Sequence, residues 1–300
     1  MFGGRIAKAL AEPGSCVRAP VRAGAAPDQL DRLPGSGITT VAVDLNNGSQ
    51  LASACQGASC VVSALQGLRD VIVEKQTVLL DTAVKAGVAR FIPSDSSIGF
   101  TRFPPGENRN LDLRRDFHKR LETASIAATT ISNGAFADRL TGQRPLTLFR
   151  WKRVLYWGDA GRRMDFTTIH DTAAFTACAA LDPSTPRHLR ITGDPLSARE
   201  SAAVAGEVTG QVFRLLRAGS LGTPAVLIKI AHATAPGENE LYPAWQGAQY
   251  MRNMFGGRAK LEPPDNSRYR GIRWTAVRDV LSTRPGVIVP ARGGIGRSLR

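Results

Sequence analysis

The sequence predicts an α/β protein built on a doubly wound parallel sheet, with a smaller and mostly helical lobe beside it. Between residues 15 and 132, short apolar runs alternate with stretches of helical periodicity, as in strands joined by crossover helices. The chain also opens on Gly3 and Gly4, which lead directly into a helical apolar stripe at Ile6 and Leu10. A glycine turn that enters a helix is typical of dinucleotide-binding proteins, so we expect a Rossmann-like sheet.

The expected strands are short runs of β-branched and apolar residues bounded by turn formers. They are Val17 to Arg22, Ile38 to Asp44, Ser59 to Leu65, Val88 to Pro93 and Ile126 to Ser132. Because helices separate them, we expect these strands to lie parallel, with helices covering both faces of the sheet.

Helices are expected in the intervals, where apolar residues recur at helical spacing. They are a short helix and turn within residues 25–37, followed by Gly48 to Gln56, Asp70 to Ala86 and Asn110 to Ala124. Gly87 is expected to end the third of these, because glycine commonly follows the last residue of a helix.

The alternation weakens after Gly134. A strand is expected at Val154 to Trp157, with helices at Asp171 to Leu181 and Ser197 to Thr209, the last one opened by a capping box of Ser197 and Glu200. We therefore expect a dinucleotide-binding part in residues 1–140, an interleaved second lobe in 141–282 and a flexible basic tail in 283–300.

Composition restricts the class of protein. The 300 residues are 43% apolar and 21% charged, enough to bury an ordinary core. No apolar run is long enough to span a membrane, and no signal peptide is evident at the N-terminus. The four cysteines are scattered through expected helices and strands, which favours reduced thiols and a cytoplasmic location.

The net charge of +14 raises the possibility of a nucleic-acid partner, but its distribution argues against one. Eleven Lys and Arg against three Asp and Glu lie between Arg252 and Arg300, so more than half of the excess is in the last 49 residues. Few aromatic residues are interleaved there for base stacking. A small-molecule partner is favoured, and the oligomeric state is left open.

Four short phrases occur in an order that is known from one protein family. They are VVSALQG from Val61, GVARFIPS from Gly87, NGAF from Asn133 and DFTTIHD from Asp165. In order and spacing, the chain resembles the NmrA-like and isoflavone-reductase-like branch of the atypical short-chain dehydrogenases/reductases. GVARFIPS is the most specific of the four phrases.

The resemblance implies that the start of the fold is missing. The family carries GATGxxGG at its first strand-to-helix turn, of which only Met1 to Gly4 have counterparts here. The sheet is therefore expected to lack its first strand, which lies centrally in a doubly wound sheet. Our hypothesis is that Met1 is an internal methionine of a longer protein, or that this is a decayed copy whose cofactor binding is impaired.

The resemblance also implies a nicotinamide dinucleotide as cofactor. A basic residue at the end of the second strand accommodates a 2′-phosphate, so Arg22 favours NADP over NAD, unless it is a solvated strand-end arginine. The expected cofactor-binding residues are Gly3, Gly4, Arg22, Asp44, Ser63, Ala64, Leu65, Pro93, Ser94, Asp95 and Asn133. For Asp44 and Asn133 a plain turn is the alternative, and for Ser63 to Leu65 a core strand.

The catalytic residues are less well defined. None of the tyrosines has a lysine four residues later, so the usual Tyr-x-x-x-Lys acid is absent. Isoflavone reductases resemble one another in a lysine that acts as acid or base, and its position falls at or near Arg114. An arginine stays protonated and cannot shuttle protons. Lys119 and His118, about a turn later, are the substitute candidates, with a solvated basic helix face as the alternative for both.

Two functions from different classes remain open. One is an NADPH-dependent reductase of a small quinone- or enone-like substrate, and the other is a non-catalytic NADP-sensing regulatory protein or an inactive truncated copy. No metal site is expected, because the histidines and cysteines show no ligand spacing.

Overall fold

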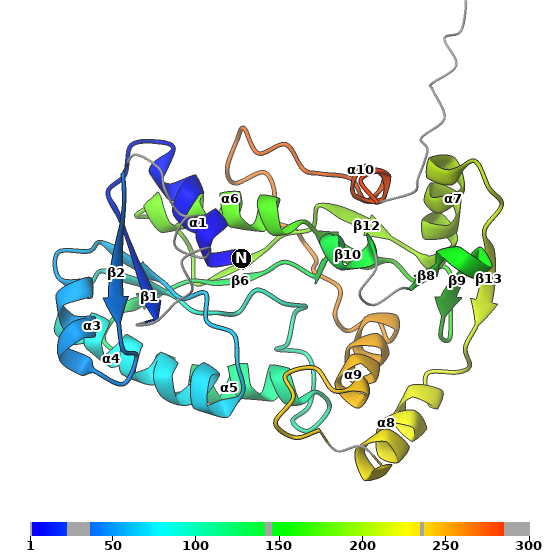
Figure 1. The fold of residues 1–300 in the computed structure, drawn as a ribbon, viewed down its shortest axis with the longest axis horizontal. Helices are drawn as coiled ribbons and strands as arrows, with labels where there is room; N and C mark the ends of the chain where they lie inside the picture. The colour runs from blue at the N-terminus through cyan, green and yellow to red at the C-terminus, as the bar shows by residue number, and fades with distance from the viewer. Residues whose placement is uncertain (1, 23–36, 142–145, 235–236, 285–300) are drawn as a thin grey trace, which may run out of the picture.

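The computed structural model describes residues 2–22, 37–141, 146–234 and 237–284. Most of the predicted helix at 25–37 and the predicted tail after Arg284 lie outside these ranges. The molecule is elongated, with the N-terminal sheet and its helices at one end and the second lobe at the other (Figure 1). No helix within the described ranges is long and apolar enough to cross a membrane.

The main sheet consists of short parallel strands. They are β1 (Val17–Arg22), β2 (Ile38–Val43), β3 (Cys60–Val62), β4 (Arg90–Ile92), β5 (Ala127–Ala128), β6 (Thr130–Ser132) and β11 (His188–Arg190). β1 pairs with β2, β3 with β4, β4 with β5, and β6 with β11, all in parallel. The predicted parallel arrangement is confirmed for every strand expected between residues 17 and 132.

The sheet is interrupted between β1 and β3. Strand β1 pairs only with β2, and β3 pairs only with β4, among the residues that the structure describes. In a doubly wound sheet the first strand lies between these two, and no described strand occupies that place here.

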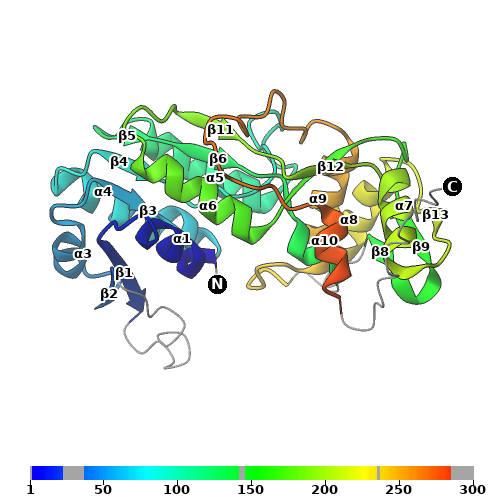
Figure 2. The same cartoon turned by 90° about the horizontal axis from the view of Figure 1, so that it is seen from above.

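Helices cover both faces of this sheet (Figure 2). They are α1 (Phe2–Ala11), α3 (Gly48–Cys55), α4 (Gln76–Lys85) preceded by a π-helical stretch (Asp70–Lys75), α5 (Arg109–Leu121) and α6 (Ile169–Leu181). Side chains cap three of them at their N-termini, namely Asn47, Asn108 and Thr168. Each of these side chains accepts hydrogen bonds from backbone N–H groups of the first turn, which have no partner within the helix.

The second lobe contains α7 (Ala198–Thr209), α8 (Thr223–Thr234), α9 (Ala244–Phe255) and α10 (Val277–Ser282). It also contains two three-stranded sheets: β7 (Ala135–Phe136), β10 (Met164–Thr167) and β12 (Asp194–Leu196), and β8 (Thr147–Leu148), β9 (Arg153–Tyr156) and β13 (Arg214–Arg217). Of these strands only β9 was expected from the sequence, as Val154 to Trp157. The capping box at α7 is confirmed: Glu200 N–H donates to Ser197 Oγ (3.2 Å), and Ser197 N–H to Glu200 Oε2 (2.8 Å).

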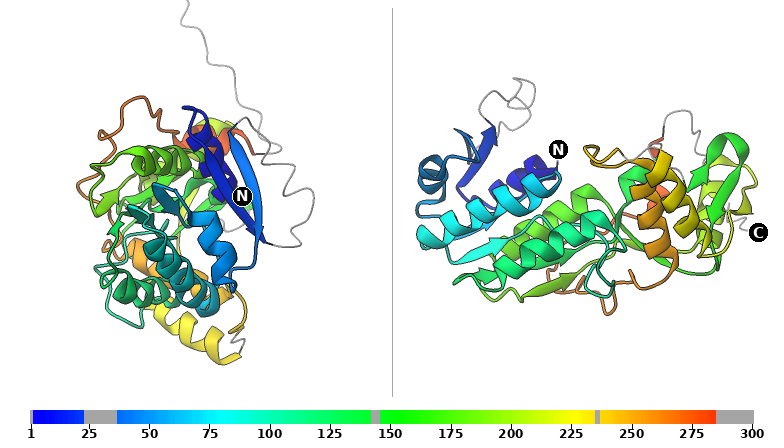
Figure 3. Two further views of the ribbon diagram at one scale, coloured as in Figure 1. Left: turned by 90° about the vertical axis from the view of Figure 1, so that its left-hand side faces the viewer. Right: turned by 90° about the horizontal axis from the view of Figure 1, so that it is seen from below.

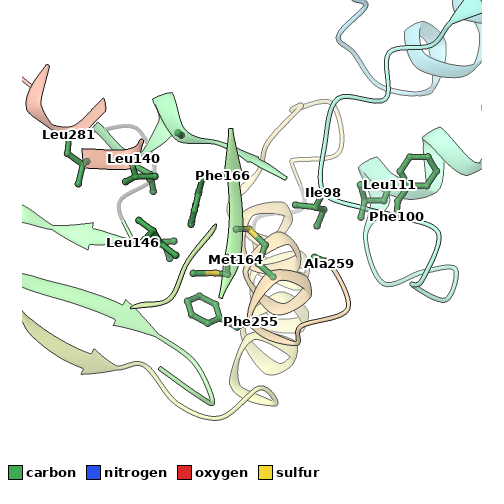
Figure 4. Packing of buried hydrophobic residues seen from close by; sticks show 14 of the residues in the cluster. Ile98, Phe100, Leu111, Leu140, Leu146, Met164, Phe166, Phe255, Ala259 and Leu281 are labelled. Carbon is green, nitrogen blue, oxygen red and sulfur yellow. The ribbon is translucent and has the colours of Figure 1, made fainter. Parts of the chain in front are cut away.

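The largest hydrophobic cluster joins the two parts of the molecule. It combines residues that precede or begin α5, such as Ile98, Phe100 and Leu111, with Phe166 of β10 and Phe255 of α9 (Figure 4). A separate cluster around Phe91 and Phe117 lies under α4 and α5. Because the first cluster is built from both parts, burial of its side chains fixes α9 beside the sheet.

The segments around β3 are more exposed than a central strand should be. All three residues of β3 are only half-buried, whereas all three residues of β6 are buried. β3 is also shorter than the predicted Ser59 to Leu65. Among the described residues β3 pairs with β4 alone, and a strand paired on one side leaves part of its surface uncovered.

Helix α1 is the main contact between the β1–β2 pair and the rest of the fold, because it packs against α6 and also against β1. Ile6 is 3% exposed within it. We expect Ile6→Ala to lower the free energy of unfolding by about 2–5 kcal/mol. Hydrogen exchange should accelerate most in β1 and β2. Lys8→Ala, at an exposed position of the same helix, is the control, and a uniform acceleration across the sheet would contradict this role of α1.

Candidate functional site

A cavity of about 2270 Å³ opens along the interruption in the sheet. Its lining comes from α1, β1, β3, α5, α6 and the region of α9. Figure 3 (right) shows the N-terminal helix and strands (blue) at one end of the molecule, away from the second lobe. Pockets for drug-sized ligands measure about 300–1,000 Å³, so this cavity could hold a dinucleotide together with a second molecule.

The N-terminus of α1 forms one end of the cavity. A Cβ atom on Gly3 would lie 3.1 Å from Ala64 Cβ, so helix and strand end approach each other there as closely as a glycine permits. Phe2 packs edge-on against Phe136, with ring centroids 5.7 Å apart. The unpaired N–H groups of a first helical turn favour an anion, so this end of the cavity is suited to a phosphate.

The strand ends supply backbone and hydroxyl groups. Ser63, Ala64 and Leu65 follow β3 and line the cavity. Ser94 Oγ donates to Leu65 O (2.5 Å), and Ser94 N–H donates to the buried Gln76 Oε1 (2.9 Å). The Ser63 hydroxyl is buried and has no partner among the described residues. The loops after β3 and β4 are thus tied together, with one hydroxyl left without a protein partner.

Two arginines of β1 have different surroundings. Arg18 donates to the backbone carbonyls of Ser53 (3.2 Å) and Gln56, so it links β1 to the end of α3. Arg22 is exposed at the end of β1 and lines the cavity. Arg22 is therefore the one of the two placed for an anionic group of a ligand.

Of the three catalytic candidates on α5, only Arg114 lines the cavity, and His118 is buried instead of lying on a solvated helix face. Its Nη1 donates to Asn110 O (2.8 Å), while its Nε is buried without a partner among the described residues. The Lys119 side chain is 78% exposed and forms an ion pair with Asp116 (2.9 Å). Lys119 thus lies on the solvated helix face, which was the alternative stated for it.

Asp95 belongs to a buried polar network and not to the cavity lining. Its Oδ2 lies 2.6 Å from His118 Nε2 and accepts a hydrogen bond from Thr130 Oγ1 (3.0 Å). Arg187 Nη1 donates to the same hydroxyl (2.7 Å). Burial lowers the pKa of Arg187, and the Asp95 carboxylate opposes that shift. This network joins β4, α5, β6 and the chain before β11.

The remaining predicted cofactor residues also lie outside the described lining. Asp44 closes a local turn, since its Oδ1 accepts from Asn46 N–H (2.9 Å). Pro93 is buried under the strand end. Asn133 is fully buried, donates from its backbone N–H to Ser97 O (3.0 Å) and accepts from Thr167 Oγ1 at its carbonyl (2.7 Å). The structure thus brings together Gly3, Gly4, Arg22, Ser63, Ala64, Leu65, Ser94 and Arg114.

Several cavity residues were not predicted. His170 and Ile169 come from the start of α6, and Tyr242, Tyr250 and Met251 come from the region of α9. His170 lies within the phrase DFTTIHD, so the sequence did point to this segment. Nothing in the sequence pointed to the α9 residues, because they reach the cavity only through packing of the second lobe.

A family model described as the NmrA-like family matches residues 1–218 of the chain. A curated relative, the isoflavone reductase homolog IRL of Zea mays, is 27% identical over 194 residues. That alignment covers 62% of this chain and 62% of the relative, so the match spans less than two thirds of the relative's length.

Solved structures share the fold across almost the whole chain. AtPrR2 with NADP+ and (+)pinoresinol has a TM-score of 0.77 at 20% identity, and the match covers 94% of each chain. An isoflavone reductase has a TM-score of 0.78 at 20% identity, covering 93% of this chain and 94% of the other. An NADPH-dependent quinone oxidoreductase from Escherichia coli has a TM-score of 0.72 at 18% identity, covering 94% and 95%.

Substitution of Asp95 tests whether this residue stabilises the fold or binds a ligand. We expect Asp95→Asn to lower the free energy of unfolding by about 1–3 kcal/mol, because it weakens the hydrogen bonds that Asp95 makes with buried His118 and Thr130. Chemical denaturation gives this change. The affinity for NADPH, measured well below the unfolding transition, should stay within about twofold of wild type. Loss of affinity with unchanged stability would instead place Asp95 in the binding site.

Proposed function

Because the chain belongs to the NmrA-like family, we propose that it binds NADP(H) in the cavity between α1, β3 and α5 and reduces a small quinone- or enone-like substrate. The observation that carries the proposal is the convergence of the α1 N-terminus, the end of β3 and Arg22 on one cavity. These groups suit a phosphate, a ribose and a 2′-phosphate respectively.

The groups present fit a dinucleotide in part. The close approach of Gly3 to Ala64 and the orphaned Ser63 hydroxyl both favour a ligand that lies against the strand ends. Among the described residues, the N–H groups that face a pyrophosphate in this position are those of the first turn of α1.

When bound, NADPH would supply the hydride, and the protein would supply orientation and a proton. Arg114 is the described residue of α5 that is placed for contact with a substrate oxygen in the cavity. Its guanidinium can donate a hydrogen bond and stabilise developing negative charge, but it does not release a proton at useful pH. Proton delivery would then fall to water, which makes turnover slow.

The same residue favours a second function. A protein that senses NADP(H) without turnover needs the binding groups but no acid, and Arg114 in place of a lysine gives that combination. The two functions share the cofactor site and differ only in whether a substrate is reduced. Consumption of NADPH across a panel of quinones and enones separates them.

Cofactor binding is tested by thermal unfolding with NADPH and with NADH. A ligand that binds only the folded chain adds about 2.7 kcal/mol at a concentration one hundred times its Kd. We expect NADPH to raise Tm and Arg22→Asp to weaken NADPH binding at least about tenfold, with little effect on NADH, because the new carboxylate repels a 2′-phosphate. Arg5→Ala, a second exposed arginine of the cavity, is the control. Equal losses for both nucleotides would remove Arg22 from this role.

The role of Arg114 is tested by Arg114→Lys. A lysine ammonium at this position can deliver a proton, so we expect NADPH consumption with an accepted quinone or enone to rise by about tenfold or more. Lys119→Ala is the control and should leave the rate unchanged, because that side chain is solvated and outside the cavity. If Arg114→Lys binds NADPH normally yet turns over none of the panel, the sensing function is supported.

A further inference from the structure

The small sheet of β8, β9 and β13 ends in an unpaired strand edge. Among the described strands β13 pairs only with β9, and it lies on the outer side of the second lobe (Figures 1 and 2). Arg214 N–H donates to Lys152 O (3.0 Å), so this peptide group faces β9. Because successive peptide groups of a strand face opposite sides, those of Leu215 and Arg217 face away from β9.

The side chains of β13 give this edge two positive charges with apolar residues between them. The strand reads Arg-Leu-Leu-Arg, in which Arg214 and Arg217 are exposed and Leu216 is 42% exposed. Arg214 is also the direct neighbour of Arg153 across the parallel pair of β9 and β13. Like charges on directly opposite residues of two strands disfavour their pairing, and a bound anion would relieve that repulsion.

The described carboxylates of the neighbouring helix α7 are engaged elsewhere. Arg163 Nε donates to Glu200 Oε1 (3.1 Å). Arg278 Nε donates to Glu207 Oε2 (3.0 Å). The basic side chains around β9 and β13 that form no ion pair with a described residue are Arg150, Lys152, Arg153, Arg199, Arg214 and Arg217. This surface therefore has an excess of positive charge and is complementary to an acidic partner.

A shallow groove beside the edge fits an apolar side chain. It has a volume of about 400 Å³ and lies between α7 and β13. Small residues of α7 and two apolar residues at β13 line it, namely Ala202, Ala203, Gly206, Phe213 and Leu215. Side chains alternate between the two faces of a sheet, so in an added strand the residue beside Leu215 lies on the groove side. Main-chain pairing and a pocket for alternate side chains are what recognition by strand addition requires.

We propose that β13 binds an extended acidic peptide of another protein, which adds a strand to this sheet and has two apolar residues between two acidic ones. The carboxylates lie beside Arg214 and Arg217, and the apolar side chains lie beside Leu215 and Leu216. This order is the same in both directions, so it suits a parallel or an antiparallel strand. A second copy of β13 does not fit, since pairing in either direction sets arginine against arginine.

The probe is a short labelled peptide with Glu-Val-Val-Glu at its centre, and its control has Val-Glu-Glu-Val at the same place. The two peptides have the same charge and composition and differ only in residue order. In fluorescence anisotropy with the full chain, the first should bind at least about tenfold more tightly. At saturation, hydrogen exchange at Leu215 and Arg217 should slow at least about tenfold, whereas Leu216, whose peptide group faces β9, should be unchanged.

Charge reversal supplies the matched variants. Arg214→Glu combined with Arg217→Glu should weaken binding of the Glu-Val-Val-Glu peptide at least about tenfold and create binding of a Lys-Val-Val-Lys peptide, because the charges are then complementary again. That gain of binding also shows that the variant is folded. Arg270→Glu combined with Arg273→Glu reverses two exposed arginines outside this sheet and should change neither affinity.

The proposal is overturned if the two glutamate peptides bind equally, since charge attraction alone then explains binding, or if exchange at Leu215 and Arg217 does not slow. An equal loss in the Arg270 and Arg273 variant overturns it as well. So does binding of phosphatidylserine vesicles or a DNA duplex without binding of the peptide, because the surface then recognises lipid or nucleic acid. None of these readouts uses NADPH, so failure of the proposed function would not affect the result.

Discussion

Helices, and not strand pairing, hold the β1–β2 pair against the rest of the described sheet. Between β1 and β3 no backbone hydrogen bonds cross the described sheet, so the β1–β2 pair is held by α1, by α3 and by the Arg18 hydrogen bonds to the end of α3. Packing of this kind is non-directional and scales with buried apolar area. The two parts of the sheet can therefore keep their order while the space between them stays open, and the size of the cavity is a direct consequence.

The chemistry of the site depends on the groups that line the cavity. The end of β3, the α1 N-terminus and Arg114 all remain on the cavity wall, because each is positioned by an element outside the interruption. In the proposed function, the α1 N-terminus contacts a phosphate, whereas the preference between the two nucleotides depends on the side chain at the end of β1.

The sequence was sufficient for the parallel strands and for the helices that separate them, because each depends on local periodicity. It also pointed to Gly3, Arg22 and Ser63, which lie at strand or helix ends, and to Arg114 within α5, all of which line the cavity. It could not reveal that Asp95 turns inward to His118, since that pairing joins residues 23 positions apart through tertiary packing. Apart from β9, it could not reveal the small sheets of the second lobe either, whose two- to four-residue strands are shorter than any periodicity can define.

The position of Pro20 bears on how such an opening can persist. A long, flat and unpaired strand edge promotes aggregation, and a proline that faces the open side removes one donor from it. In a complete sheet the same proline would leave a carbonyl of the neighbouring strand without its partner, at a cost of about 1–3 kcal/mol. Pro20 therefore suits β1 as an edge strand better than as an interior one. The β3 edge, which consists of Cys60, Val61 and Val62, has no proline.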